Sequence, residues 1–459
     1  MVFLNAIKNK ISERIANING DSKTKTLVSN VKYSVVIKIV TVAISFLSVP
    51  LLINYLNSTQ YGIWLTILTF TSWFTLFDLG LGNGLKNKLI EFITKGNMSL
   101  ARKYVTTTYM SMSLICILLC IIISLFDMYI PWDKIFNVPV SLQSPVATAT
   151  TLVLIFTLLS MILKLINNLL YANQQSFKVD IINFITQLTG FIALCAAKIF
   201  LKSSLVTIAL VFTLSQLSVL IIINVYLFRK KFRELIPSFV DYDFALTKEV
   251  MSISGRFFFI QIAGLIMYMT DNFIIANLFG PKDVTVYNIA LKYFTVLSTA
   301  WALIIVPLWP MITKAYYSND LNWIKKTLDK LLKLLIVTIA VGVIMFFLSG
   351  IFYKIWVGRA VYIPSSVSLV ILLYSCISIF ATIMATFING TGKITLQAYI
   401  TGGVAVINIP LAIFFSKVLN FELIGVPLAT AVCLLISSIF AFLQVKKIIS
   451  VKAAGIWDK

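Results

Sequence analysis

The sequence predicts an all-α integral membrane protein with twelve transmembrane helices. Of its 459 residues, 59% are hydrophobic and only 12% are charged, whereas about a quarter of the residues in soluble proteins are charged. The apolar residues gather in long runs of roughly the twenty residues that a helix needs to cross a bilayer. The polar connections between the runs are too short for an extramembrane domain to fold from them.

The predicted spans follow one another with short polar breaks. We expect them near residues 33–56, 61–84, 104–130, 146–172, 177–201, 204–228, 252–279, 284–313, 330–351, 363–388, 395–418 and 421–445. The fourth span is long, and the eighth is interrupted by Pro307 and Pro310. An even number of spans places both chain termini on one side of the membrane.

The basic residues indicate which side that is. The chain has 38 Lys and Arg against 17 Asp and Glu, a formal charge of +21. In a soluble protein this excess would suggest nucleic acid, but in a membrane protein Lys and Arg concentrate in cytoplasmic segments. Most of them precede the first span or follow an even-numbered span. We therefore expect both termini in the cytoplasm and no nucleic-acid partner.

Two pairs of similar segments indicate an internal repeat. Ile53–Leu65 resembles Ala276–Asn288 at an offset of 223 residues, and the polar turn Leu170–Lys178 resembles Phe387–Thr395. Six crossings return the chain to its starting side, so the repeat is parallel, an arrangement that many transporters use. The domains expected are a tail at 1–32, an N-lobe at 33–228, an interlobe loop at 229–251, a C-lobe at 252–445 and a tail at 446–459.

The composition argues against enzymes, metals and cofactors. Histidine is absent, and it is the commonest general base and metal ligand. The five cysteines lie in apolar segments without C-x-x-C spacing, and no phosphate-binding loop motif occurs. Asp241, Tyr242 and Asp243 form a D-x-D pattern, but their loop has no room for a nucleotide-sugar fold. We predict a non-enzyme without metal or cofactor.

Four cations fall inside predicted spans: Lys38, Lys164, Arg256 and Lys292. Charges at this depth are costly and usually face a bundle interior or a water-filled cavity. The alternative is that the side chains reach back to the membrane surface, which fits Lys38 and Arg256 best because they lie near the cytoplasmic boundary.

Polar residues at helical spacing accompany these cations, so each set lies on one face of its helix. The sets are Lys38, Thr41, Ser45 and Ser48; Thr157, Ser160, Lys164, Asn167 and Tyr171; Asp180, Asn183, Gln187 and Gly190; and Asn288, Lys292, Thr295 and Thr299. Four polar faces predict a shared lumen with more positive than negative charge. Such a lumen suits an anionic cargo, above all one that carries phosphate.

Two aspartates have open interpretations. Asp78 follows the second span, before glycines and Lys86, where it either pairs with cations at a helix end or takes part in gating. Asp271 lies toward the outer end of the seventh span, where it either pairs with a cation or caps a helix end.

Several motifs resemble one known family. Tyr61–Trp64 reads Y-G-I-W and Phe77–Gly82 reads F-D-L-G-L-G, while Thr270–Gly280 reads T-D-N-F-I-I-A-N-L-F-G and is followed by Val286 and Tyr287. These stretches resemble the second-helix and seventh-helix patterns of polysaccharide flippases. Those proteins are the O-antigen and capsule exporters of the multidrug/oligosaccharidyl-lipid/polysaccharide (MOP) superfamily.

The resemblance implies two six-helix lobes that alternate between inward-open and outward-open states in the bacterial plasma membrane. The implied cargo is an oligosaccharide on undecaprenyl pyrophosphate, moved to the outer leaflet among membrane lipids. A polysaccharide polymerase and a chain-length regulator are implied partners. The family's cationic lumen would be supplied by Lys38, Lys164, Arg256 and Lys292, which include a single arginine.

Three other readings remain. A multidrug exporter shares the fold, but we expect it to carry acids in its lumen. A membrane glycosyltransferase or polymerase is expected to have a large external loop, which this chain lacks. A lipid II flippase is expected to have two additional helices.

Overall fold

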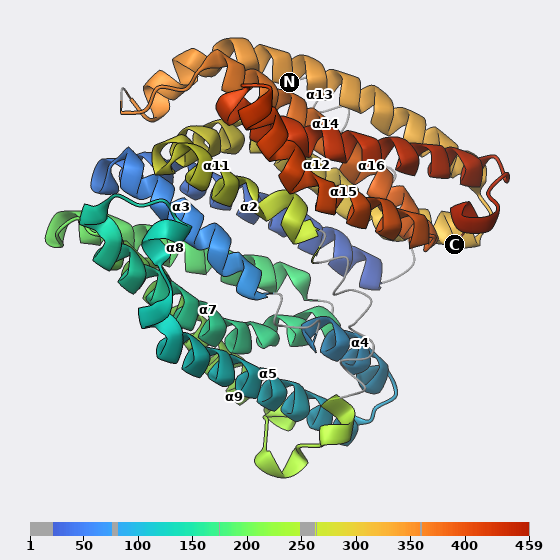
Figure 1. Ribbon diagram of the computed structural model, residues 1–459. Coiled ribbons are helices and arrows are strands. Elements are labelled where there is room, and N and C mark those ends of the chain that lie inside the picture. Colours follow the sequence, from blue (N-terminus) through green and yellow to red (C-terminus); the bar gives the residue numbers. More distant parts are fainter. Residues whose placement is uncertain are drawn as a thin grey trace.

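The computed structural model describes residues 22–75, 81–173, 175–247, 262, 264–358 and 360–458, and this part of the chain is built from helices (Figure 1). Two sequence candidates, Asp78 and Arg256, lie outside the described residues. The interlobe loop predicted at 229–251 is described only as far as residue 247.

The long helices fall into two consecutive sets along the chain, which we name the N-half and the C-half. The N-half contains α2 (Ser22–Leu56), α3 (Ser58–Trp73), α4 (Leu81–Thr94), α5 (Met98–Phe126), α7 (Gln143–Ala172), α8 (Ser176–Phe200) and α9 (Leu205–Lys230). The C-half contains α11 (Asp271–Phe279), α12 (Pro281–Tyr317), α13 (Leu321–Trp356), α14 (Ser365–Thr391), α15 (Thr395–Ile413) and α16 (Gly425–Ile449).

Short elements connect these helices. They are η2 (Asp127–Tyr129), α6 (Trp132–Ile135), η3 (Val140–Leu142), η4 (Arg233–Leu235), η5 (Phe239–Asp241), the π-helical η6 (Phe414–Val418), η7 (Glu422–Ile424) and η8 (Gly455–Asp458).

Ten helices of the described chain are long and apolar enough to cross a membrane, and they coincide with ten of the predicted spans. The chain is therefore a multi-pass membrane protein. The second predicted span, 61–84, differs from the observed helices: α3 has only 16 residues, and α4 continues to Thr94. The first part of the seventh predicted span, 252–261, lies outside the described residues, and α11 covers its end.

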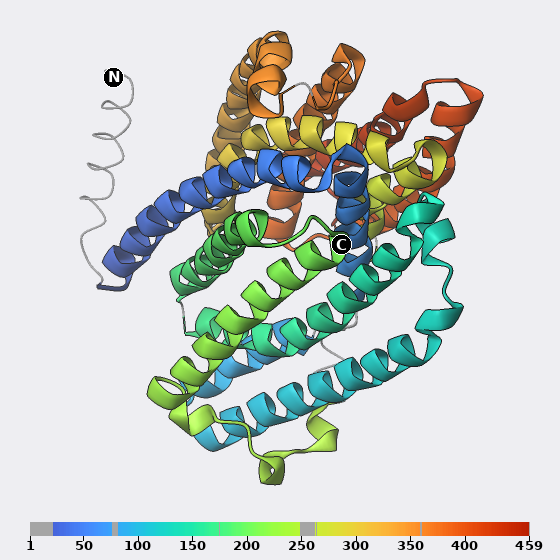
Figure 2. The same ribbon diagram turned by 90° about the vertical axis from the view of Figure 1, so that its left-hand side faces the viewer.

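Each half packs mainly within itself. In the N-half α7 packs against α5 and α9, and α8 packs against α2 and α9; in the C-half α14 lies between α12 and α16, and α15 packs against α16. The two views show the halves as two bodies of helices, with α2 and α3 between them (Figures 1 and 2). The largest contact between the halves is that of α3 with α12, and α11 adds a second contact with α3.

Two single-residue breaks have almost the same backbone geometry. Asn57 separates α2 from α3 with φ 71° and ψ 168°, and Gly280 separates α11 from α12 with φ 100° and ψ 169°. Positive φ is costly for most residues, while Gly adopts it freely and Asn tolerates it. These breaks lie at equivalent places in the two segments that the sequence pairs as a repeat.

The two breaks also lie where the halves touch. The Thr285 hydroxyl donates to the carbonyl oxygen of Ser58 at 2.6 Å. At Gly62 a Cβ atom would stand 1.7 Å from the carbonyl oxygen of Pro281. The approach of α3 to α12 therefore requires glycine at this position.

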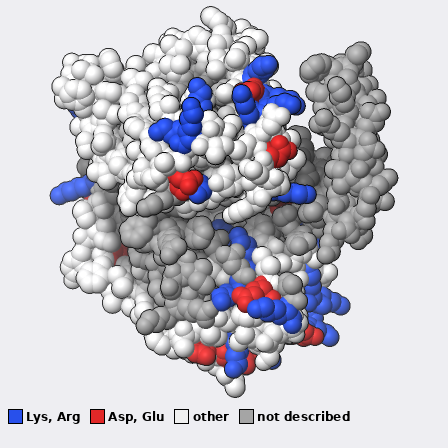
Figure 3. All heavy atoms as spheres, turned by 90° about the vertical axis from the view of Figure 1, so that its right-hand side faces the viewer, with Lys and Arg blue, Asp and Glu red and all other residues white. Residues whose placement is uncertain are grey.

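Figure 3 shows the end of the molecule that carries the C-terminus, where Lys and Arg side chains gather with some Asp and Glu among them. It is the end that the charge pattern assigns to the cytoplasm.

Candidate functional site

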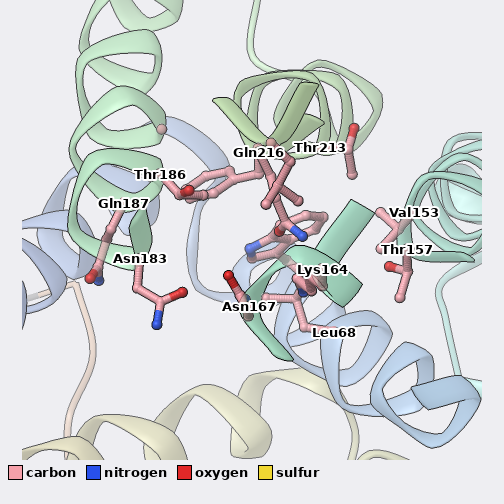
Figure 4. A pocket seen from close by; sticks show the side chains of 14 residues that line it. Leu68, Val153, Thr157, Lys164, Asn167, Asn183, Thr186, Gln187, Thr213 and Gln216 are labelled. Atoms are coloured by element: carbon pink, nitrogen blue, oxygen red, sulfur yellow. The ribbon is translucent and has the colours of Figure 1, made fainter. Parts of the chain in front are cut away.

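The N-half contains an open polar cavity of about 310 Å³ between α3, α7, α8 and α9 (Figure 4). Its polar lining residues are Thr157, Lys164, Asn167, Asn183, Thr186, Gln187, Thr213 and Gln216. Its other lining residues are Trp64, Leu68, Val153, Gly190, Phe212 and Leu220. Amides and hydroxyls therefore surround a single charged side chain, Lys164.

Helical periodicity places these side chains together. On α7, Lys164 follows Thr157 after two turns and precedes Asn167 by three residues, so the three share one face. On α8, Asn183 and Gln187 are four residues apart and face the same cavity. The structure thus brings Lys164, Asn183 and Gln187, three candidates from two helices, to one site.

Lys164 reaches into this cavity, where Figure 4 shows it beside Asn167. Within the described parts of the chain its ammonium group has no hydrogen-bond or ion-pair partner, and no carboxylate lines the cavity. The Oδ1 atom of Asn167 is buried and also lacks a protein partner there. The Lys164 ammonium group can therefore engage a bound polar ligand.

Lys38 and Asp180 lie together outside the cavity lining. Lys38 Nζ on α2 is 4.0 Å from Asp180 Oδ1 on α8, and both side chains are partly exposed. Asp180 lies one helical turn before Asn183, toward the start of α8. An exposed ion pair of this kind adds little stability. Its main effect is that the charge of Asp180, the acid of α8, is balanced by Lys38.

Asp271 is buried in the C-half and does not line the polar cavity. Its carboxylate accepts hydrogen bonds from the Tyr287 hydroxyl at 2.9 Å and from the Thr430 hydroxyl at 3.0 Å. The Asn408 amide donates to the same Thr430 oxygen at 3.1 Å. Within the described ranges its hydrogen-bond partners are hydroxyl groups and not a cation, and Thr270 occupies the N-cap of α11. Asp271 instead connects α11 with α12 and α16.

Asn288 and Lys292 lie on α12 and do not line the polar cavity. Asn288 donates to Asn272 on α11 at 2.6 Å, and Asn272 donates to Thr69 on α3 at 2.7 Å. This chain of hydrogen bonds crosses between the halves. Lys292, one turn further along α12, is half-buried and has no ion-pair partner within the described ranges.

Several cavity residues were missed by the sequence analysis. Gln216 and Thr213 on α9 line the cavity, as do the rings of Trp64 and Phe212, whose centroids are 5.7 Å apart. Thr213 and Gln216 are three residues apart in a mostly apolar span, and that spacing was a usable signal. Trp64 gave no comparable signal, because tryptophan is also common in membrane-protein cores and at interfaces.

Solved membrane transporters have the same fold. A multidrug resistance MATE family transporter of the MOP superfamily, in its inward-facing conformation, matches with a TM-score of 0.74 at 15% identity, over 89% of this chain and 98% of that one. The lipid II flippase MurJ, in an inward closed conformation, matches with a TM-score of 0.70 at 15% identity, over 90% and 87%. The chain therefore has the fold of the MOP transporters.

The family is defined by sequence. Residues 27–316, more than half of the chain, match the family described as polysaccharide biosynthesis protein, and the chain belongs to this family. A protein of Salmonella typhi described as an O-antigen transporter is 21% identical over 60% of this chain, and the match spans 62% of that relative's length. A Yersinia pseudotuberculosis protein described as an O-antigen export protein is 20% identical, over 78% of this chain and 82% of its own.

Proposed function

We propose that this protein is a flippase for oligosaccharides linked to undecaprenyl pyrophosphate, of the O-antigen or capsule type. It moves them from the inner to the outer leaflet of the bacterial plasma membrane. Two six-helix lobes, 33–228 and 252–445, alternate access to the cargo, with both chain termini in the cytoplasm. The family membership and the MOP fold support this proposal.

The observation that carries the proposal is the lining of the polar cavity. A free lysine ammonium binds phosphate oxygens through charge-assisted hydrogen bonds, which are roughly twice as strong as neutral ones. The amides of Asn167, Asn183 and Gln187 offer both donors and acceptors, which match sugar hydroxyls. With no carboxylate in the lining, an anion meets no repulsion there.

A lined cavity solves the physical problem of this cargo. Pyrophosphate and sugars lose their water in hydrocarbon without gaining other partners, which makes unaided crossing very costly. The cavity supplies replacement partners, while the prenyl chain remains in lipid. The inside-negative membrane potential favours outward movement by about 2.3 kcal/mol per charge per 100 mV, or roughly 5 kcal/mol for two charges.

The cavity chemistry disfavours a multidrug exporter of the same fold. An exporter of cationic drugs needs acids in its lumen, but the nearest acid on α8, Asp180, is paired with Lys38. The D-x-D motif has structural roles: Asp241 pairs with Arg102 at 3.0 Å, and Asp243 Oδ1 accepts from the backbone of Ala245 at 2.9 Å. Polymer formation is therefore left to separate membrane partners, a polymerase and a chain-length regulator.

Deleting the gene and complementing it tests this proposal in cells. We expect surface polysaccharide to disappear and lipid-linked repeat units to accumulate inside, with rescue by the natural sequence. Lys164→Gln should fail to rescue, while Lys198→Gln, which changes an exposed lysine at the end of α8, should rescue fully. Intact polysaccharide together with increased drug sensitivity would instead identify a multidrug exporter.

A further inference from the structure

The segment that follows α9 presents an apolar tip that does not line the polar cavity. We define the apolar tip as Phe239, Val240 and Phe244, whose exposed fractions are 90%, 92% and 74%. In Figures 1 and 2 the yellow-green segment that contains it lies beyond α5 and α9, on the side away from the C-half. The tip therefore projects sideways from the helical bundle and away from the contact between the halves.

Hydrogen bonds to α5 hold this segment in place on both sides of the tip. The Thr106 hydroxyl accepts from the backbone N–H of Ser238 at 3.2 Å. One residue further along α5, the Thr107 hydroxyl accepts from the backbone N–H of Asp243, also at 3.2 Å. Phe239 and Val240 lie between these two attachment points, and Phe244 lies just beyond the second. Their backbone is therefore held by α5 while their side chains remain exposed.

Arg102 provides a further attachment at the start of α5. Its Nε lies 3.0 Å from Asp241 Oδ2 and donates to the carbonyl oxygen of Ile236 at 3.2 Å. On the other side of the segment, the hydroxyl groups of Ser111 and Thr247 are 3.0 Å apart. The attachments extend along α5 from its first turn into its apolar part, so the segment lies beside a membrane span rather than above it.

Basic residues precede the tip directly. Arg229, Lys230 and Arg233 are all exposed. The acids nearby are Glu234, which is exposed, and Asp243, because Asp241 is paired with Arg102. The exposed residues at 229–234, which precede the tip in the chain, therefore carry a net positive charge.

Large apolar side chains beside basic ones, at the level where spans meet the cytoplasm, match the chemistry of the membrane interface. Apolar rings enter the boundary between headgroups and acyl chains, and Lys and Arg bind anionic headgroups there. We propose that residues 229–247 form an interfacial anchor that inserts the apolar tip into the cytoplasmic leaflet and binds anionic phospholipids. This anchor is independent of the cargo and of the polar cavity.

Site-specific fluorescence in lipid nanodiscs tests the anchor with the full chain. A bimane label is placed at Val240→Cys in a background without the five native cysteines. Asn319→Cys, in the exposed polar turn after α12, is the matched control at the same end of the molecule. We expect lipids with spin labels on their acyl chains to quench the label at 240 about threefold more than the label at 319, and iodide in the water to give the reverse order.

A second experiment varies the charge of the lipid. We expect quenching at 240 to be stronger in discs with anionic phosphatidylglycerol than in purely zwitterionic discs, and a Lys230→Gln, Arg233→Gln variant to remove the difference. Equal access of iodide to both labels would overturn the anchor, because a tip reserved for a protein partner stays in water when only lipid is present. If quenching at 240 is the same in anionic and zwitterionic discs, and the same in the natural protein and the Gln variant, the preference for anionic lipids is wrong.

Discussion

Lys164 gives the polar cavity its charge, and the side chains around it are neutral. The other intramembrane lysine near this region, Lys38, is beside Asp180. An ammonium group without a protein counter-ion is stabilised when a phosphate binds to it. Substrate affinity should therefore depend on this single side chain more than on any amide of the lining.

Replacing Lys164 by Gln should weaken binding of a prenyl pyrophosphate about tenfold or more, because a charge-assisted hydrogen bond contributes about 1.5–3 kcal/mol. Lys164→Arg should keep most of the affinity, since the charge remains. Fluorescence titration in detergent with a labelled lipid measures both variants. Equal affinities for the Gln variant and the natural protein would place the phosphate elsewhere.

At Asp271 the residue-scale prediction concerns stability. Asp271→Ala should lower the free energy of unfolding by about 1–3 kcal/mol, because the buried hydroxyls of Tyr287 and Thr430 lose their acceptor. Thermal denaturation in detergent measures the change, and Asp320→Ala, which removes an exposed N-cap of α13, is the milder control. A stability unchanged by Asp271→Ala would show that the carboxylate does not hold α11 to its neighbours.

Sequence spacing predicted part of this site. Lys164, Asn183 and Gln187 stood out because polar residues recur on one face of an apolar helix. The separation of Asn288 and Lys292 from the cavity could not be predicted. Periodicity shows which residues share one face of a helix, but it does not show which other helix packs against that face. The role of Asp271 was missed for the same reason: its partners Tyr287 and Thr430 lie 16 and 159 residues away.

At the scale of elements, the approach of α3 to α12 depends on Gly62. A methyl group there would collide with the carbonyl oxygen of Pro281. The Pro281 oxygen is a backbone atom, and a Cβ atom is fixed by the backbone that carries it. A change of rotamer therefore cannot relieve the collision, and the helices must separate. The sequence predicted two spans here and a turn at Asn57, but it gave no sign of this contact or of the end of α3 at Trp73.

Gly62→Ala should therefore open this contact. We expect Thr285→Cys, at a buried position in the natural protein, to react severalfold faster with a membrane-impermeant maleimide added from outside. Gly403→Ala is the control, because a Cβ there meets nothing within 4 Å. Unchanged labelling in the Gly62→Ala background would mean that the helices accommodate the methyl group without separating.

For the whole molecule, composition and run length predicted the membrane class, and ten spans coincide with long apolar helices. The twelve-helix count, the repeat and the cytoplasmic termini remain predictions. The breaks at Asn57 and Gly280 support the repeat, since both have positive φ and nearly equal ψ and they lie 223 residues apart, at the offset of the paired segments. The polar cavity lies within the N-half alone, although the pattern had predicted one lumen shared by four helices of both halves.

We propose that the whole molecule moves a pyrophosphate-linked oligosaccharide across the bilayer. The most direct measurement is a vesicle assay with purified protein and a fluorescent undecaprenyl pyrophosphate oligosaccharide, in which an impermeant reagent reports the leaflet that holds the lipid. We predict protein-dependent translocation that an inside-negative potential accelerates outward and that Lys164→Gln abolishes while Lys198→Gln does not. Vesicles that move a cationic dye but leave the lipid-linked oligosaccharide in its original leaflet would show that the protein is not a flippase for this lipid.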